Sequence, residues 1–153
     1  MRIDDNQQVG IGIILPQALL HVGGTARFDG AVTLSDGSTI PDYVFEKYFL
    51  GYSALDPDYK MLDLESIRKY IQKNHHLPGV MSALEIQENG GINLNQTLLK
   101  NLEKIEELFL HTIEQEQKIQ SLEEEKEILT REVSELKLRL DRIEKALTQK
   151  EKN

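Results

Sequence analysis

Mostly apolar residues spaced alternately three and four positions apart run from residue 94 to residue 147. Their mean spacing is the ~3.5-residue period of a left-handed coiled coil, kept in one register through about eight heptads. A single helix kept soluble by Glu and Lys side chains would leave this seam in water, so the pattern predicts that identical chains associate along it. The predicted oligomerisation core occupies heptad positions a and d, at Leu94, Leu98, Ile105, Leu108, Thr112, Gln115, Ile119, Leu122, Lys126, Leu129, Val133, Leu136, Leu140, Ile143 and Leu147.

The placement of charges predicts that the associated helices run parallel. In a parallel coiled coil, position g of one helix lies beside position e of the next heptad in its neighbour. Exposed pairs of this kind bias orientation without driving association, because each is worth only a few tenths of a kcal/mol. The charged pairs that result are opposite in sign, namely Lys118 with Glu123, Glu132 with Lys137, and Arg139 with Glu144.

The seam leaves the number of chains open. Isoleucine and valine at a with leucine at d favour a dimer, as does Lys126 at a, whereas Leu140 at a with Ile143 at d favours a higher order. Polar residues in such a core reduce stability but fix register and chain number. The polar residues of the core are Asn101, Thr112, Gln115 and Lys126.

The first half of this helix has a wider apolar face than the second. Between residues 98 and 113, apolar side chains also occupy e positions, at Leu102 and Phe109, whereas beyond Ile119 the stripe narrows to a and d. A wider face indicates an additional neighbour. We expect the aromatic segment 43–52 to fold back on it.

Residues 1–40 predict a β-rich segment made of very short strands. Apolar residues alternate with glycine in VGIGI at 9–13, and later apolar runs are separated by Gly-Gly and by Asp-Gly turns at 29–30 and 36–37. Strands this short are not stable alone, so we expect them to pair with sister chains in a fibre shaft. The alternatives are a small monomeric sandwich fragment and a flexible tether. The later strands are expected at 19–22, 26–28, 31–34 and 38–40.

Residues 41–92 predict a compact mixed connector. A turn at 56–58 precedes a helix over about 64–73, and a capping box of Ser82 and Glu85 begins a short helix that ends at Asn89-Gly90-Gly91. The predicted fold is therefore α+β and elongated. Its predicted parts are a β-rich shaft segment (1–40), the connector (41–92) and a C-terminal parallel coiled coil (93–153).

Charge and cysteine content argue against several classes of protein. A net charge of −8 disfavours binding to nucleic acid or to an anionic membrane, and the lack of cysteine rules out disulfides and thiolate metal sites. No stretch approaches the ~20 apolar residues of a membrane span. The first residues lack the apolar run of a signal peptide, so we expect either no export by that route or the end of a longer polypeptide.

No pattern predicts catalysis or a cofactor. His75 and His76 are adjacent, which rarely lets both bind one metal, and we expect one to pack in the following loop and the other to face water. His111, at a g position, is expected at the surface or between layers. Ser66 and Lys69 share a helix face but lack an oxyanion hole. The sequence therefore predicts that the protein is not an enzyme and has neither cofactor nor metal.

Several motifs occur in a specific order along the chain: VGIG at 9–12, PQALLHV at 16–22, PDYVFEK at 41–47, HLPGV at 76–80 and LEKIEEL at 102–108. Together they resemble the C-terminal region of tail-fibre-like surface proteins of Bacteroidetes, with Ile13-Ile14 departing from the usual Thr or Ser. The resemblance implies an extracellular fibre, usually trimeric, with a terminal coiled coil. Such fibres occur on cell surfaces, phage-like particles and contractile injection systems.

The leading hypothesis is a structural part of an oligomeric tail-fibre-like appendage, whose partners are its own copies and other fibre or baseplate proteins. A second hypothesis is adhesion, in which the connector is a fibre tip that binds a receptor or glycan by stacking on aromatic rings. A third is an intracellular coiled-coil scaffold, which leaves the β-rich start unexplained. The candidate receptor contacts are Tyr43, Tyr48, Tyr52 and Tyr59.

Overall fold

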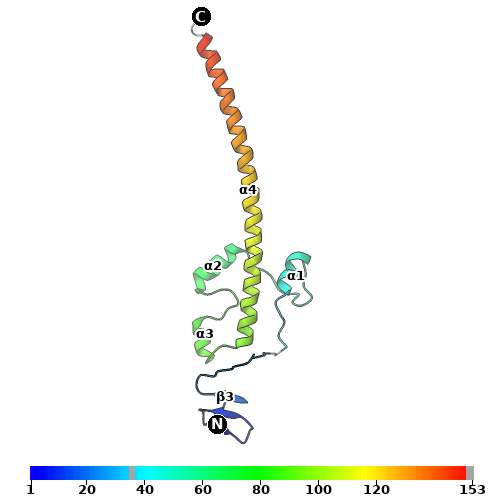
Figure 1. Ribbon diagram of the computed structural model, residues 1–153, viewed down its shortest axis with the longest axis vertical. Coiled ribbons are helices and arrows are strands. Elements are labelled where there is room, and N and C mark those ends of the chain that lie inside the picture. Colours follow the sequence, from blue (N-terminus) through cyan, green and yellow to red (C-terminus); the bar gives the residue numbers. More distant parts are fainter. Residues whose placement is uncertain (35–36, 151–153) are drawn as a thin grey trace. The chain divides into compact units, whose positions relative to one another are not determined.

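The structure is a computed structural model that describes residues 1–34 and 37–150, with side chains to residue 148. It has an α+β fold in two compact units, Met1–Asp36 and Gly37–Asn153, so the predicted connector and long helix belong to one unit (Figure 1). Asp36 of an expected turn and residues 151–153 of the predicted coiled coil lie outside the described residues.

The first unit contains a small three-stranded sheet in the order β1-β2-β3. Strand β2 (Val9–Ile11) pairs antiparallel with β1 (Arg2–Ile3) and parallel with β3 (Leu20–Val22). The strands predicted near 9–13 and 19–22 are thus confirmed in shortened form, whereas β1 was not predicted.

Glycine alternates with apolar residues here because the chain passes very close to itself. A Cβ atom on Gly10 would lie 2.7 Å from the carbonyl oxygen of Ile13, and one on Gly23 would lie 2.7 Å from the Ile13 side chain. Gly12 has a φ of 71°, a conformation that glycine adopts without strain. The glycines of the VGIG motif therefore allow the chain to pass close to itself beside β2.

The strands expected at 26–28, 31–34 and 38–40 are absent from the described chain. These predictions are wrong for a single chain. A strand needs a neighbour that satisfies its backbone groups, and the sheet of this unit ends at β1 and β3. Apolar alternation can therefore indicate strand propensity without supplying a partner.

The second unit contains α1 (Tyr43–Leu50), α2 (Leu64–Asn74), α3 (Ala83–Glu88) and α4 (Leu94–Lys150). The predicted helices correspond to α2, α3 and α4, and the capping box of Ser82 and Glu85 is present. The turn predicted at 56–58 is confirmed, since the Tyr59 amide donates to the Asp56 carbonyl at 3.3 Å. Helix α1 was not predicted as a helix, and it ends at Gly51, which has a φ of 78°.

Helix α4 spans 57 residues without a break. Asn93 initiates it, since its side-chain oxygen accepts from the Gln96 amide at 3.0 Å. Helix α1 lies on one side of its first half, and α2 and α3 lie on another (Figure 1). From Thr112 to Thr148 every residue of α4 is exposed, so the described chain places nothing against the second half.

Candidate functional site

The chain packs against one side of α4. Leu110 of α4 is completely buried against Val44, Tyr43 and Tyr59, which come from α1 and the segment that follows it. The two tyrosine rings pack on each other with centroids 4.9 Å apart. Leu110 occupies heptad position f, which lies on the side of the helix away from a and d. The core of this unit therefore covers the back of the predicted seam.

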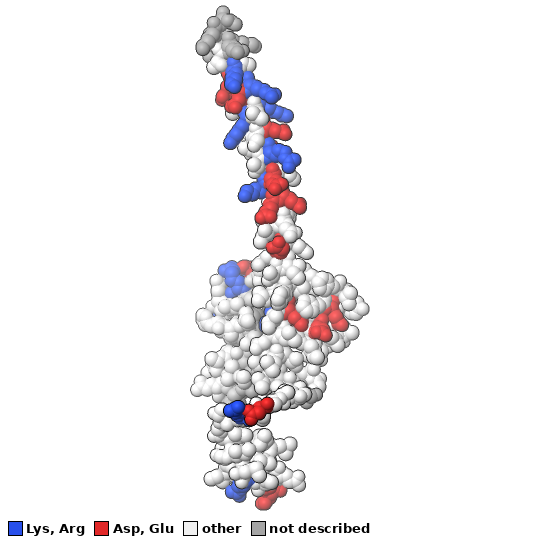
Figure 2. Space-filling model, viewed as in Figure 1, with Lys and Arg blue, Asp and Glu red and all other residues white. Residues whose placement is uncertain are grey.

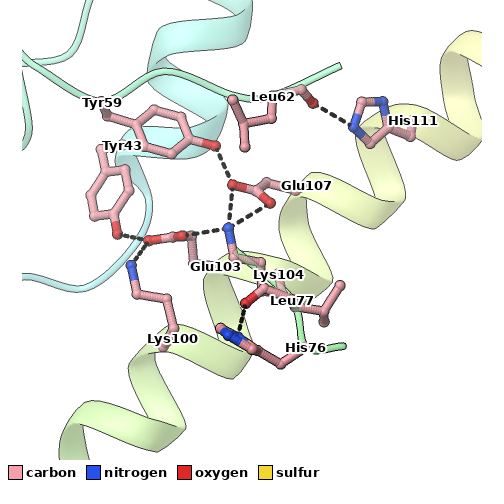
Figure 3. A network of polar contacts seen from close by, with 10 residues as sticks. All are labelled: Tyr43, Tyr59, Leu62, His76, Leu77, Lys100, Glu103, Lys104, Glu107 and His111. Atoms are coloured by element: carbon pink, nitrogen blue, oxygen red, sulfur yellow. Dashed lines mark hydrogen bonds and ion pairs between the residues drawn. The ribbon is translucent and has the colours of Figure 1, made fainter. Parts of the chain in front are cut away.

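A polar network extends this core along α4 (Figure 3). The Tyr43 hydroxyl donates to Glu103 at 2.5 Å, and the Tyr59 hydroxyl donates to Glu107 at 2.9 Å. Lys104 lies between the two carboxylates, 2.8 Å from Glu103 and 2.9 Å from Glu107. Lys100 adds a second cation, 2.6 Å from Glu103. Glu103 and Glu107 thus each have both a cation and a hydroxyl donor.

The network shifts the pKa of its charged groups. Burial acts to raise the pKa of Glu103, but the bonds from Lys100, Lys104 and Tyr43 outweigh it and hold that pKa below its usual value. Burial acts to lower the pKa of Lys104, and the two glutamates raise it overall. Burial and the neighbouring carboxylates raise the pKa of Tyr43 and Tyr59 well above the usual tyrosine value. All four groups therefore keep their ordinary charge states near neutral pH.

His111 also belongs to this covered side. It is 7% exposed, and its Nε2 lies 3.1 Å from the carbonyl oxygen of Leu62. Of the two expected placements of His111, the surface position is wrong, because the side chain is buried between α4 and the segment that contains Leu62. The segment before α2 passes α4 beside His111 and covers the side of the helix on which heptad position g lies.

Glu106 differs from the other buried glutamates. It is 7% exposed, and its Oε2 atom has no hydrogen-bond partner among the described residues. Burial raises its pKa, and the nearby charges of Asp42 and Glu103 raise it further. An uncompensated buried carboxylate destabilises the packing of α1 against α4.

The opposite side of α4 is open along its whole length. The apolar residues of the predicted seam are between 48% and 62% exposed, and the polar Thr112, Gln115 and Lys126 are exposed as well. Seam residues beside the other helices, such as Leu108, are no better covered than those in the second half, such as Leu129. The described chain therefore leaves the seam without a partner.

The segment 43–52 does pack against the first half of α4, as predicted, but it uses a different face. It contacts Leu110 and the glutamates near it, while Leu102 and Phe109 of the widened apolar face are 39% and 62% exposed. In the described chain, segment 43–52 therefore does not bury this apolar widening.

The four candidate receptor contacts do not form one surface. Tyr43 and Tyr59 are each only 9% exposed and their hydroxyls bind glutamates, which corrects their assignment as surface contacts. Tyr48 and Tyr52 are exposed, at 36% and 64%.

Sequence reasoning missed the network of Lys100, Glu103, Lys104 and Glu107, because charged residues beside a heptad seam normally face water. One signal was present. Leu110 is apolar but lies outside the a and d register, which indicates a second buried side of the helix.

The adjacent histidines are placed as expected. His75 ends α2 with a φ of 61° and is exposed, whereas His76 packs edge-on against Tyr70 and its Nδ1 lies 3.0 Å from the Leu77 carbonyl oxygen. Among the described residues, no three His, Asp or Glu side chains are grouped to hold a metal ion. No helix in the described part of the chain combines the length and apolarity needed to cross a bilayer.

Comparisons with known proteins found no matching family model, no similar curated protein and no similar solved structure.

Proposed function

We propose that the chain is a structural subunit of a tail-fibre-like surface appendage, in which α4 joins identical copies as a parallel coiled coil. One observation carries this proposal. The chain buries the back of α4 against its own residues and leaves the a and d residues exposed over the full heptad register. A seam of this length is stable in water only when another helix covers it.

The two halves of α4 differ in surface chemistry in a way that fits this role. Charges of both signs follow each other along the second half (Figure 2), whereas Glu103, Glu106 and Glu107 of the first half are buried against the chain. In the second half these charges flank the seam at positions e and g, where a parallel neighbour would meet the opposite sign. These pairs of opposite sign favour a parallel assembly.

A trimer is the preferred assembly and a dimer the second candidate. The branching pattern of the seam alone leans toward two chains, and the resemblance to tail-fibre-like proteins leans toward three. Polar residues at Thr112, Gln115 and Lys126 would fix the register, because a shifted pairing would place them against apolar layers.

The first unit is proposed to continue the assembly as a shaft. Its exposed apolar residues include Ile14, Leu15, Leu19 and Phe28, each at least 66% exposed. Side chains of this kind need a cover in water, and sister chains can supply both that cover and strand partners for residues 26–34. The same resemblance supports an extracellular location on a cell surface or phage-like particle, with fibre or baseplate proteins as further partners.

Two adjacent substitutions in α4 test the proposal. Leu129 at d and Ile128 at c are both apolar and similarly exposed in the chain, at 52% and 54%. Only the coiled coil distinguishes them, because position c faces away from the seam. Lysine at either position keeps a good helix former and changes the charge equally.

Sedimentation equilibrium at several concentrations measures the outcome. We expect the wild-type chain to have a mass two or three times 17.5 kDa at micromolar concentration. Leu129→Lys should weaken association by more than about 100-fold, since burying a leucine contributes roughly 1.5–3 kcal/mol in each chain. Ile128→Lys should leave the mass unchanged. A wild-type particle of 17.5 kDa, or equal effects of both substitutions, would overturn the proposal.

A receptor- or glycan-binding tip remains the second candidate, supported by exposed aromatic rings at the end of α1. Phe49 and Tyr52 are 69% and 64% exposed on either side of Gly51. Rings exposed in this way can stack on the faces of sugars.

A further inference from the structure

The two flanks of the seam are chemically different in the first half of α4. On the e flank, Leu102 and Phe109 are apolar and exposed. On the g flank, Lys104 is held by Glu103 and Glu107, with only 18% of its side chain exposed. In the second half both flanks carry charges. The first half therefore cannot use the ion pairs of the second half to meet a neighbouring chain.

A groove borders the seam on the g flank near the start of α4. It has a volume of about 370 Å³ and lies between the first turns of α4, α3 with the loop that precedes it, and the chain around the start of α1 at Ser38, Thr39 and Tyr43. Thr97 at position g and Asn101 at position d form the edge of the groove nearest the seam, whereas Gln96, Leu99 and Lys100 line the part toward the back of the helix. Its apolar wall is formed by Val80, Met81, Ile86 and Ile92.

The register of the coiled coil determines which residue of a second copy meets this groove. The opposite charges of Lys118 and Glu123, and of the later g and e pairs, set parallel helices in register. Helix α4 is unbroken, so the same register extends to its first turns. There position g is Thr97, and the matching e position of the neighbour, five residues further on, is Leu102.

We propose that Leu102 of one chain docks against the groove beside Thr97 of the neighbouring chain. The small helices of each subunit (α1, α2 and α3) then help to bind helix α4 of the next subunit. The occupant is a second copy of this chain. The complementary charges of the two helices bring Leu102 to the groove. The apolar wall of the groove suits this apolar side chain, which is 39% exposed in the single chain. One heptad further along, Phe109 lies against the aliphatic stem of the neighbour's residue at position 104, which is Lys104.

In a trimer this contact is heterologous, because the e flank of each chain meets the g flank of the next, whereas in a two-fold dimer the same contact forms twice. Every subunit both inserts a Leu102 and offers a groove, and a closed ring satisfies all of them. The inference rests on the proposed function, since it requires parallel association. It adds that the small helices take part in the assembly and are not merely carried by it.

Cross-linking between two single-cysteine variants tests this contact, because the chain contains no cysteine of its own. Leu102→Cys and Ile92→Cys chains are refolded together and treated with a short bis-maleimide. Each chain carries one cysteine, so every covalent pair joins two chains. A mixture of Lys118→Cys and Glu123→Cys chains reports on the second half of the coil in the same way.

We expect both mixtures to give covalent pairs in several-fold higher yield than any single variant alone. If only the mixture of Lys118→Cys and Glu123→Cys chains gave cross-linked product, the docking of Leu102 would be refuted, whereas the coiled coil would still be supported. No product from either mixture, together with the mass of a single chain, would refute the proposed function as well.

A second measurement does not depend on cross-linking. In the associated protein, Leu102→Gln should lower the melting temperature of the small helices by several degrees, whereas it should have little effect at dilutions where the chains separate. Leu84→Gln is the matched control, because Leu84 of α3 is exposed and lies outside the groove lining. Equal melting temperatures for the two variants in the associated protein would count against the proposal.

Discussion

Leu108 and Leu110 lie two residues apart on α4 but belong to opposite sides of it, and the structure predicts opposite consequences for their truncation. Leu110 is 0% exposed and packs in the core with the two buried tyrosines. Leu108 is 62% exposed in the single chain and belongs to the seam. Replacing each with alanine removes the same atoms from two different interfaces and barely changes helix propensity.

The expected magnitudes differ by several-fold. Leu110→Ala leaves a cavity in a fully packed site, and such substitutions cost about 2–5 kcal/mol. Leu108→Ala removes a side chain that is mostly in water, so in separate chains we expect a loss below about 1 kcal/mol. In the proposed coiled coil the Leu108 side chain would be covered, and its truncation should weaken association by at least about tenfold.

Tyrosine signals can separate these effects. All five tyrosines lie between residues 43 and 70 and the chain has no tryptophan, so near-ultraviolet circular dichroism reports on the helices packed around Leu110. Urea unfolding followed by this signal gives the free energy of unfolding of the core, and sedimentation gives the association constant. Leu110→Ala should lower the free energy of unfolding of the core at every protein concentration, and Leu108→Ala should lower the association constant.

The reasoning would be refuted if Leu110→Ala lowered the stability of the core by less than about 1 kcal/mol. It would also be refuted if Leu108→Ala had the larger effect in dilute, separated chains. Either result would mean that the covered and open sides of α4 are assigned incorrectly.

Two further predictions concern the polar groups of the core. Burial and the charge of Asp42 raise the pKa of Glu106, so the folded state binds a proton on this carboxylate more tightly than the unfolded state does. The stability that this proton contributes is present at low pH and is lost as the pH rises through the raised pKa. Glu106→Gln should therefore raise the melting temperature at pH 7, with the gain vanishing below about pH 4; a gain that is independent of pH would contradict this. Tyr59→Phe should cost about 1.5–3 kcal/mol in urea unfolding, because it removes the hydroxyl bonded to the charged Glu107, whereas the exposed Tyr52→Phe should change stability by less than about 0.5 kcal/mol.

The features that the sequence predicted well are local ones. Helix α4 follows from its heptads, and α3 follows from the capping box of Ser82 and the glycines after Glu88. These patterns involve residues that are close along the chain, so the chemistry that determines them is visible in the sequence.

The features that were missed depend on contacts between distant residues. Helix α1 contains several aromatic residues, which carry no strong helical preference, and it packs on Leu110, more than 60 positions away. The strand predictions at 26–34 failed because extended pairing requires a neighbour that the described chain does not offer. The network of Glu103 and Glu107 depends on which side of α4 the connector covers, and the apolar widening indicated the wrong side.

Because the core and the open seam occupy opposite sides of one continuous helix, the direction in which each subunit presents its small helices is not free. In the proposed assembly the small helices of the subunits would point outward from the common axis at equal angles around it. Any rotation of α4 about its own axis would turn these helices with it, so a torque applied at the C-terminal end of the bundle would be transmitted to them through the unbroken part of the helix beyond His111.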